Sequence, residues 1–270
     1  MRILRVHDNH DKIEKVASAL AAVWREGGVL PVMAEEWLPV DMTEAFAMQD
    51  ALHGKLGYEM VGWKLGITSP TGQKATGIPH PMIGRLYRHV VQNDPGRFPA
   101  SGFRRPVIEG EITLRLGKAL PARETPYTDD DVRDALSEII MGIDIADTRW
   151  DANPMAGEVS PIVVAADNGG MGGFVVGAVI PDWQNIDLAA LPVQVEVDGV
   201  PAGELWTGDA RGDPISAVCW AANELSRRGL GFQAGDIVST GSAHEPVPAT
   251  LGVETVVRFS RSKVRVTLER

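Results

Sequence analysis

The first quarter of the chain carries apolar residues with the spacing of helices. Over residues 11–25, the apolar side chains that recur at this spacing are Ile13, Val16, Ala17, Leu20 and Trp24. Such spacing gathers them on one face, so we predict an amphipathic helix over residues 11–25. A second helix is expected after Asp41, because Glu44 follows three residues later in a capping-box arrangement.

From Val61 onward the pattern changes to short segments rich in β-branched residues, which Gly and Pro separate. The strand candidates are residues 61–68, 106–116, 138–147, 172–180, 193–197, 235–240, 254–260 and 264–269. Two helices interrupt them, one beginning near Thr128 with acidic residues in its first turn, and one over residues 214–228. The pattern therefore predicts an α+β protein, with helices first and strands later.

Composition and charge argue against several classes of protein. The 270 residues carry a net charge of −10, which disfavours a broad phosphate-binding surface and hence a nucleic-acid partner. No apolar run reaches about 18 residues, and the N-terminus lacks the apolar core of a signal peptide, so we expect no membrane span. The single cysteine, Cys219, excludes an intramolecular disulfide. We therefore expect a cytoplasmic protein.

Two glutamates separated by one residue carry most of the chemical information. Glu109 and Glu111 lie in the strand candidate over residues 106–116. Residues i and i+2 of a strand share a face, so both carboxylates project to the same side. Like charges held side by side repel, and a divalent cation between them is the usual solution. The alternative is an edge strand with a solvated acidic face, and these residues alone leave both interpretations open.

Two further charged residues lie in segments that otherwise look buried. Lys64 stands in the apolar strand candidate 61–68, where its side chain either snorkels outward or faces a cavity lined with acids. In the second case it is able to transfer protons. Asp144 stands between Ile143 and Ile145, and a buried carboxylate needs a partner. A metal ion shared with the glutamate pair would satisfy it.

Two polar segments follow apolar runs and complement these charges. Asp167 and Asn168 come directly after one such run. Thr240, Gly241 and Ser242 end the strand candidate over residues 235–240, and their hydroxyls and backbone amides are suited to an anionic group.

Five segments in this order resemble the fumarylacetoacetate hydrolase superfamily: VGWKLGITS, VIEGEI, IDIADTRW, ADN and AGDIVSTG. Within it the chain is most similar to the branch of 2-keto-4-pentenoate hydratases and 4-oxalocrotonate decarboxylases, from about Asp41 to the C-terminus. The resemblance implies a mixed β-roll or sandwich with a small helical N-terminal part. We place the helical part and the first strand in residues 1–78 and the catalytic domain in residues 79–270. Homo-oligomers built on dimers are expected.

The resemblance also implies roles for individual residues. The family's three carboxylates bind Mg²⁺ or Mn²⁺ and map onto Glu109, Glu111 and Asp144, and its catalytic lysine maps onto Lys64. The residues expected to bind substrate are Arg149, Asp167, Asn168, Thr240, Gly241 and Ser242. The implied enzyme is a lyase that adds water to a 2-hydroxy-2,4-dienoate, a small 2-oxo or 2-hydroxy-dienoic acid, during the breakdown of aromatic compounds.

Three positions depart from the pattern of the hydratase branch. Asp144 replaces the usual glutamate and is one methylene shorter. Pro79 stands where relatives often carry an acid that assists proton transfer, and either the neighbouring His80 replaces it as a catalytic residue or the chemistry differs. His244 and Glu245 replace small apolar residues, so they either reshape the substrate end of the pocket or form a solvated loop.

These departures leave three alternative functions open. A decarboxylase would use the same metal site but release CO₂ from a 2-oxo-3-enedioate. An acylpyruvate or other carbon–carbon bond hydrolase would need a His–Glu pair near the N-terminal part, and no such pair is evident, although His80 is nearby. A non-catalytic partner subunit is the third alternative, and Lys64 argues against it because a scaffold has no need of a lysine in that strand.

Overall fold

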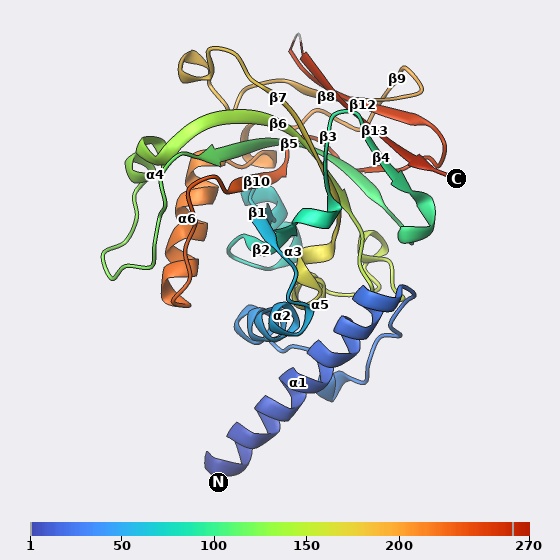
Figure 1. Ribbon diagram of the computed structural model, residues 1–270, viewed down its shortest axis with the longest axis vertical. Helices are drawn as coiled ribbons and strands as arrows, with labels where there is room; N and C mark the ends of the chain where they lie inside the picture. Colours follow the sequence, from blue (N-terminus) through green and yellow to red (C-terminus); the bar gives the residue numbers. More distant parts are fainter. Residues whose placement is uncertain (1, 261) are drawn as a thin grey trace.

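An eight-stranded mixed sheet forms the centre of the computed structural model, which describes residues 2–260 and 262–270 (Figure 1). Its strands follow the order β2 (Met82–Tyr87), β1 (Met60–Gly66), β10 (Ile237–Ser242), β5 (Val107–Leu116), β6 (Leu136–Ala146), β7 (Met171–Val179) and β3 (Val91–Asn93), and β11 (Val247–Pro248) pairs with β5. The β5 strand is therefore flanked on both sides. The predicted α+β class is confirmed.

A second, five-stranded sheet packs on one face of the first. Its order is β4 (Gly96–Pro99), β13 (Ser262–Glu269), β12 (Glu254–Phe259), β8 (Val193–Val197) and β9 (Val200–Ala202). Two glycines of the first sheet mark the closest approach, because a Cβ on Gly110 would lie 2.4 Å from Val257 Cγ1 and one on Gly177 would lie 3.0 Å from Val264 Cβ. Figure 1 shows this second sheet above the arched strands β5 and β6.

The N-terminal helices lie at the opposite end of the molecule from the second sheet (Figure 1). Helix α1 (Arg2–Glu26) contains the helix predicted over residues 11–25, and its buried face contacts α2 (Met42–Leu56). Asp41 caps α2 by accepting a hydrogen bond from Glu44 N at 2.8 Å. Both predicted N-terminal helices are confirmed. Within the described residues, no helix is long and apolar enough to cross a bilayer.

The remaining helices are short and connect strands. They are α3 (Pro70–Thr76), α4 (Asp129–Ala135), α5 (Pro161–Ala166) and α6 (Pro214–Arg227). Strand β1 pairs with β2 and β10, so it belongs to the main sheet although it comes early in the chain. The division at residue 78 therefore stays a prediction about folding units.

Candidate active site

Three carboxylates meet where β5 and β6 run side by side. Register pairs Glu109 with Asp144, and the alternation of β5 puts Glu111 on the same face as Glu109. One oxygen atom from each of the three side chains lies within 4.8 Å of the others. Glu111 and Asp144 are fully buried, at 0% exposure. The edge-strand interpretation of the glutamate pair is therefore wrong, because β5 is an interior strand.

Neighbouring groups hold Glu111 in place on one side only. Its Oε2 accepts hydrogen bonds from Gly241 N at 2.8 Å and from Ser239 Oγ. Among the described residues, Glu111 Oε1 and Asp144 Oδ1 have no hydrogen-bond partner although both are buried. A buried polar atom without a partner is costly, so these oxygens are expected to have a ligand.

The electrostatics of the three carboxylates favour the binding of a cation. Burial, followed by the charge of Asp144, raises the pKa of Glu109 to about 7. Burial and the neighbouring carboxylates also raise the pKa of Glu111, and burial raises that of Asp144. A set of hard oxygen donors with unpartnered atoms fits a divalent cation such as Mg²⁺ or Mn²⁺.

Lys64 lies against the same three carboxylates. Its Nζ is 2.5 Å from Asp144 Oδ2, and its side chain is only 4% exposed. Burial lowers the pKa of this ammonium, but Asp144, Glu109 and Glu111 outweigh burial and raise the pKa above its ordinary value. The three carboxylates therefore favour the protonated form of Lys64.

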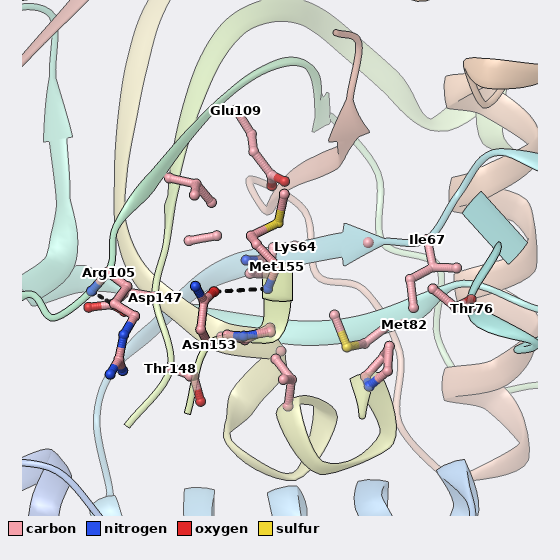
Figure 2. Close-up of a pocket in the computed structure, with 18 of the residues that line it drawn as sticks. Lys64, Ile67, Thr76, Met82, Arg105, Glu109, Asp147, Thr148, Asn153 and Met155 are labelled. Carbon is pink, nitrogen blue, oxygen red and sulfur yellow. Dashed lines mark hydrogen bonds between the residues drawn. The ribbon is translucent and has the colours of Figure 1, made fainter. Parts of the chain in front are cut away.

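A cavity of about 290 Å³ opens beside Lys64 and Glu109, both of which line it. Figure 2 shows Met155 projecting toward Glu109, with Ile67, Thr76 and Met82 to the right of them in this view. Most of its wall is apolar, and the polar lining residues include Asn153, Thr148 and Arg105. One end of the cavity thus carries the charged side chains of Glu109 and Lys64, and its walls are suited to a short hydrocarbon chain.

Asp167 and Arg149, expected to bind substrate, are occupied by contacts with the protein. Asp167 is fully buried and accepts hydrogen bonds from Trp24 Nε1 at 2.8 Å, Thr148 Oγ1 at 2.9 Å and Arg149 N at 2.6 Å. Arg149 Nε lies 3.2 Å from Asp167, and its other two nitrogens donate to backbone carbonyls. Both residues therefore stabilise the loop that follows β6, and their contact with substrate stays a prediction.

Asn168 has a similar supporting place. Its Oδ1 accepts from Arg85 N at 2.7 Å and its Nδ2 donates to Arg85 O at 2.9 Å. These bonds fix the short turn over Asn168–Gly170, and Gly169 and Gly170 line the cavity directly. Neither glycine was predicted from the sequence to line the site. Their signal in the sequence was the glycine-rich segment over residues 168–173, because a glycine exposes backbone amides to a ligand.

The Thr240–Ser242 segment binds β5 instead of facing the cavity. Thr240 Oγ1 donates to Ile112 O at 2.7 Å, Gly241 N donates to Glu111, and Ser242 Oγ donates to His244 O at 2.6 Å. These residues are not among those that line the cavity. The segment orients the carboxylate of Glu111, and direct substrate binding by it stays a prediction.

His80 lies outside the cavity lining as well. Its ring stacks on Trp220 with centroids 5.3 Å apart, and its Nδ1 lies 3.0 Å from Pro81 O. Thr76 and Met82, on either side of it in the chain, do line the cavity. The structure therefore does not bring His80 to the carboxylates, and the catalytic role expected for it stays a prediction.

One known protein family matches most of the chain. Residues 73–264 match the family described as "Fumarylacetoacetate (FAA) hydrolase C-terminal". The chain belongs to the fumarylacetoacetate hydrolase family. A 2-hydroxyhexa-2,4-dienoate hydratase of Comamonas testosteroni is 33% identical over 198 residues, 73% of each chain. A 2-keto-4-pentenoate hydratase of Paraburkholderia phymatum is 29% identical over 238 residues, 86% of this chain and 87% of the other.

The same fumarylacetoacetate hydrolase fold is found among solved structures. The 4-oxalocrotonate decarboxylase from Pseudomonas putida G7, complexed with magnesium and adipate, superposes with a TM-score of 0.84. The match covers 96% of this chain and 98% of the decarboxylase, at 24% sequence identity. At that identity the likeness shows the fold.

Proposed function

We propose that this protein is a divalent-metal-dependent hydratase that adds water to a 2-hydroxy-2,4-dienoate and yields a 4-hydroxy-2-oxo acid, in the breakdown of aromatic compounds. The observation that carries the proposal is the meeting of Glu109, Glu111 and Asp144 with Lys64 at one end of a cavity. Two relatives named as dienoate or pentenoate hydratases support the choice of reaction.

Glu109, Glu111 and Asp144 are the residues that would hold Mg²⁺ or Mn²⁺. When bound, the ion acts as a Lewis acid that favours the enolate form of a 2-oxo acid. Ser239 and Gly241 fix one oxygen of Glu111 and leave its other oxygen free to bind. The shorter Asp144 is directed by its pairing with Glu109 across the two strands.

Lys64 would move the protons that hydration requires. Ketonisation of a 2-hydroxy-2,4-dienoate removes the proton of the 2-hydroxyl and adds one at C5, which leaves a 3,4 double bond conjugated with the 2-oxo group. Water then adds its oxygen at C4 and a proton at C3, so the net reaction is the addition of one molecule of water. An ammonium held in a nearly dry site, with Asp144 at 2.5 Å, is placed to hold and exchange those protons at Nζ.

The cavity would select a small, partly apolar substrate. At about 290 Å³ it lies at the lower end of ligand pockets, which suits an acid of five or six carbons. Met82, Met155 and Val164 line it and present apolar surface to the hydrocarbon part of a dienoate. The Gly169–Gly170 backbone lets a substrate approach closely, because no side chain intervenes.

The test is a product analysis with purified protein and Mg²⁺. The substrates are a 2-hydroxy-2,4-dienoate, a 2-oxo-3-enedioate and an acylpyruvate, each with a control from which the metal has been removed by chelation. We expect a 4-hydroxy-2-oxo acid from the dienoate and no turnover after chelation. Release of CO₂ from the enedioate, with no hydration of the dienoate, would make the protein a decarboxylase. Cleavage of the acylpyruvate into two products would make it a hydrolase.

Three further expectations stay proposals. A homo-oligomer built on dimers is expected from the family resemblance, and light scattering coupled to gel filtration measures it. The cytoplasmic location and the identity of the ion, Mg²⁺ or Mn²⁺, also stay predictions. Metal analysis of the protein as purified from cells grown in metal-balanced medium would decide the ion.

A further inference from the structure

Strand β5 has a gap in its pairing between Glu111 and Ile108, next to the glutamate pair. On the β10 side, pairing with β5 runs as far as Ser242 opposite Glu111, and it resumes where Val247 of β11 pairs with Ile108. Gly110 falls in this gap. Its carbonyl accepts a hydrogen bond from Ala243 N at 3.0 Å, but its N–H has no backbone carbonyl opposite it on this side.

The side chain of His244 closes this gap. Its Nε2 lies 2.7 Å from Gly110 N and accepts the hydrogen bond that a partner strand would otherwise accept. Its Nδ1 lies 2.6 Å from Glu245 O, and the residue is only 1% exposed. A backbone N–H can only donate and a carbonyl can only accept, so the ring is neutral with its proton on Nδ1.

Gly110 is held tightly on the face opposite the carboxylates. A Cβ placed there would lie 2.4 Å from Val257 Cγ1 and 3.0 Å from His244 Nε2. Successive residues of a strand face opposite sides, so the face of Gly110 that meets Val257 and His244 is opposite the face from which Glu109 and Glu111 project. Any rotation of the Gly110 peptide must therefore move the carboxylates on both sides of it.

We propose that His244 is a positioning residue that sets the spacing of Glu109 and Glu111 through the Gly110 amide. The inference rests on the metal site of the proposed function and adds a residue to it. His244 is not among the residues that line the cavity, so it acts through β5 and not on the substrate. Both earlier interpretations of His244, a pocket residue or a solvated loop, are therefore replaced.

Neutrality of the ring follows from its surroundings as well as from its partners. Burial lowers the pKa of His244, and the nearby Glu245 only partly opposes this effect. A proton on Nε2 would place two N–H groups against each other across 2.7 Å. The ring therefore stays a fixed acceptor, which is what a positioning role requires.

Two variants of similar size separate the acceptor from the volume of the side chain. His244→Gln carries an acceptor oxygen near the place of Nε2, whereas His244→Met fills a similar volume without a comparable acceptor. Loss of a group that orients metal ligands typically costs about 10- to 100-fold in metal affinity, so we expect that loss in His244→Met. His244→Gln should recover most of the affinity.

The measurement is calorimetric titration of Mg²⁺ and Mn²⁺ into both variants and wild type, with circular dichroism as the check on folding. Equal affinity in wild type and a folded His244→Met would overturn the positioning role and leave the proposed function intact. Equal weakening in both variants would also overturn it, because the acceptor would not matter. A wild type that binds no metal would instead overturn the metal site itself.

A second readout needs neither metal nor substrate. In protein labelled with ¹⁵N-histidine, the ring nitrogens report the tautomer directly, and the His244→Gln variant assigns the signal by its absence. We expect a neutral His244 ring with the proton on Nδ1 at pH 7. A charged ring, or a proton on Nε2, would refute the bond to Gly110 even where His244→Met fails to fold.

Discussion

Two substitutions of Lys64 distinguish the role of its positive charge from its role in proton transfer. Lys64→Arg keeps a cation near Asp144 but removes a group able to release a proton near neutral pH. Lys64→Met keeps an unbranched side chain and removes both the charge and the proton. The cavity beside Lys64 leaves room for the longer arginine.

The structure gives the expected magnitudes. Lys64 Nζ lies 2.5 Å from Asp144 Oδ2, and the two side chains are 4% and 0% exposed. Removing one partner of a buried ion pair costs about 3–5 kcal/mol, so the metal-free Lys64→Met variant should lose about that much unfolding free energy. Lys64→Arg should keep most of it. Turnover should fall by about 10²- to 10⁴-fold in both variants, because neither side chain transfers a proton.

The assay has two arms. Urea unfolding of protein freed of metal by chelation measures stability, and turnover at saturating Mg²⁺ measures catalysis, with metal affinity determined separately. Turnover of Lys64→Arg close to that of wild type would refute proton transfer and leave Lys64 as a counter-charge. Equal destabilisation by Arg and Met would refute the argument that the charge pair with Asp144 carries the stability.

Three further predictions test the carboxylates, the packing and the thiol. Glu109→Gln or Glu111→Gln should greatly weaken Mg²⁺ binding in calorimetry, because hard cations depend on ionised oxygens, and unchanged affinity in both would refute the metal site. Gly110→Ala should lower unfolding free energy by about 1–3 kcal/mol because its Cβ would lie 2.4 Å from Val257, and adding Val257→Ala should restore part of that loss in urea melts. Burial raises the pKa of the Cys219 thiol to about 11. Alkylation of Cys219 at pH 8 should therefore be about 100-fold slower in the folded protein than in the unfolded protein, and its rate should increase with pH. Equal rates in the two states would contradict the raised pKa.

Local patterns in the sequence were sufficient for several features. The helix over residues 11–25 and the cap at Asp41 depend on spacing and on neighbours within one turn, and both are present in the structure. The shared face of Glu109 and Glu111 depends only on the alternation of a strand. Each of these properties is set by residues a few positions apart, so it can be predicted without the fold.

Contacts between distant segments decided the rest. The chain alone left open whether the strand of Glu109 and Glu111 was an edge strand, because that depends on the pairing of β5 with β10 and β6. Asp167, Asn168 and Thr240 have the polar side chains of a binding site, but hydrogen bonds from remote segments occupy them. The type of a polar side chain limits the groups that it can bind, and only the fold determines which of those groups lies close enough to bind it.

His244 illustrates the same limit most clearly. As a sequence position it was consistent with a pocket residue and, slightly better, with a solvated loop. The structure places its ring in a gap between β10 and β11, against an amide 134 positions away in the chain. The sequence by itself determined the carboxylates and the faces on which they lie. Only the tertiary structure decided which groups hold them, because a hydrogen bond depends on proximity in space and not on distance along the chain.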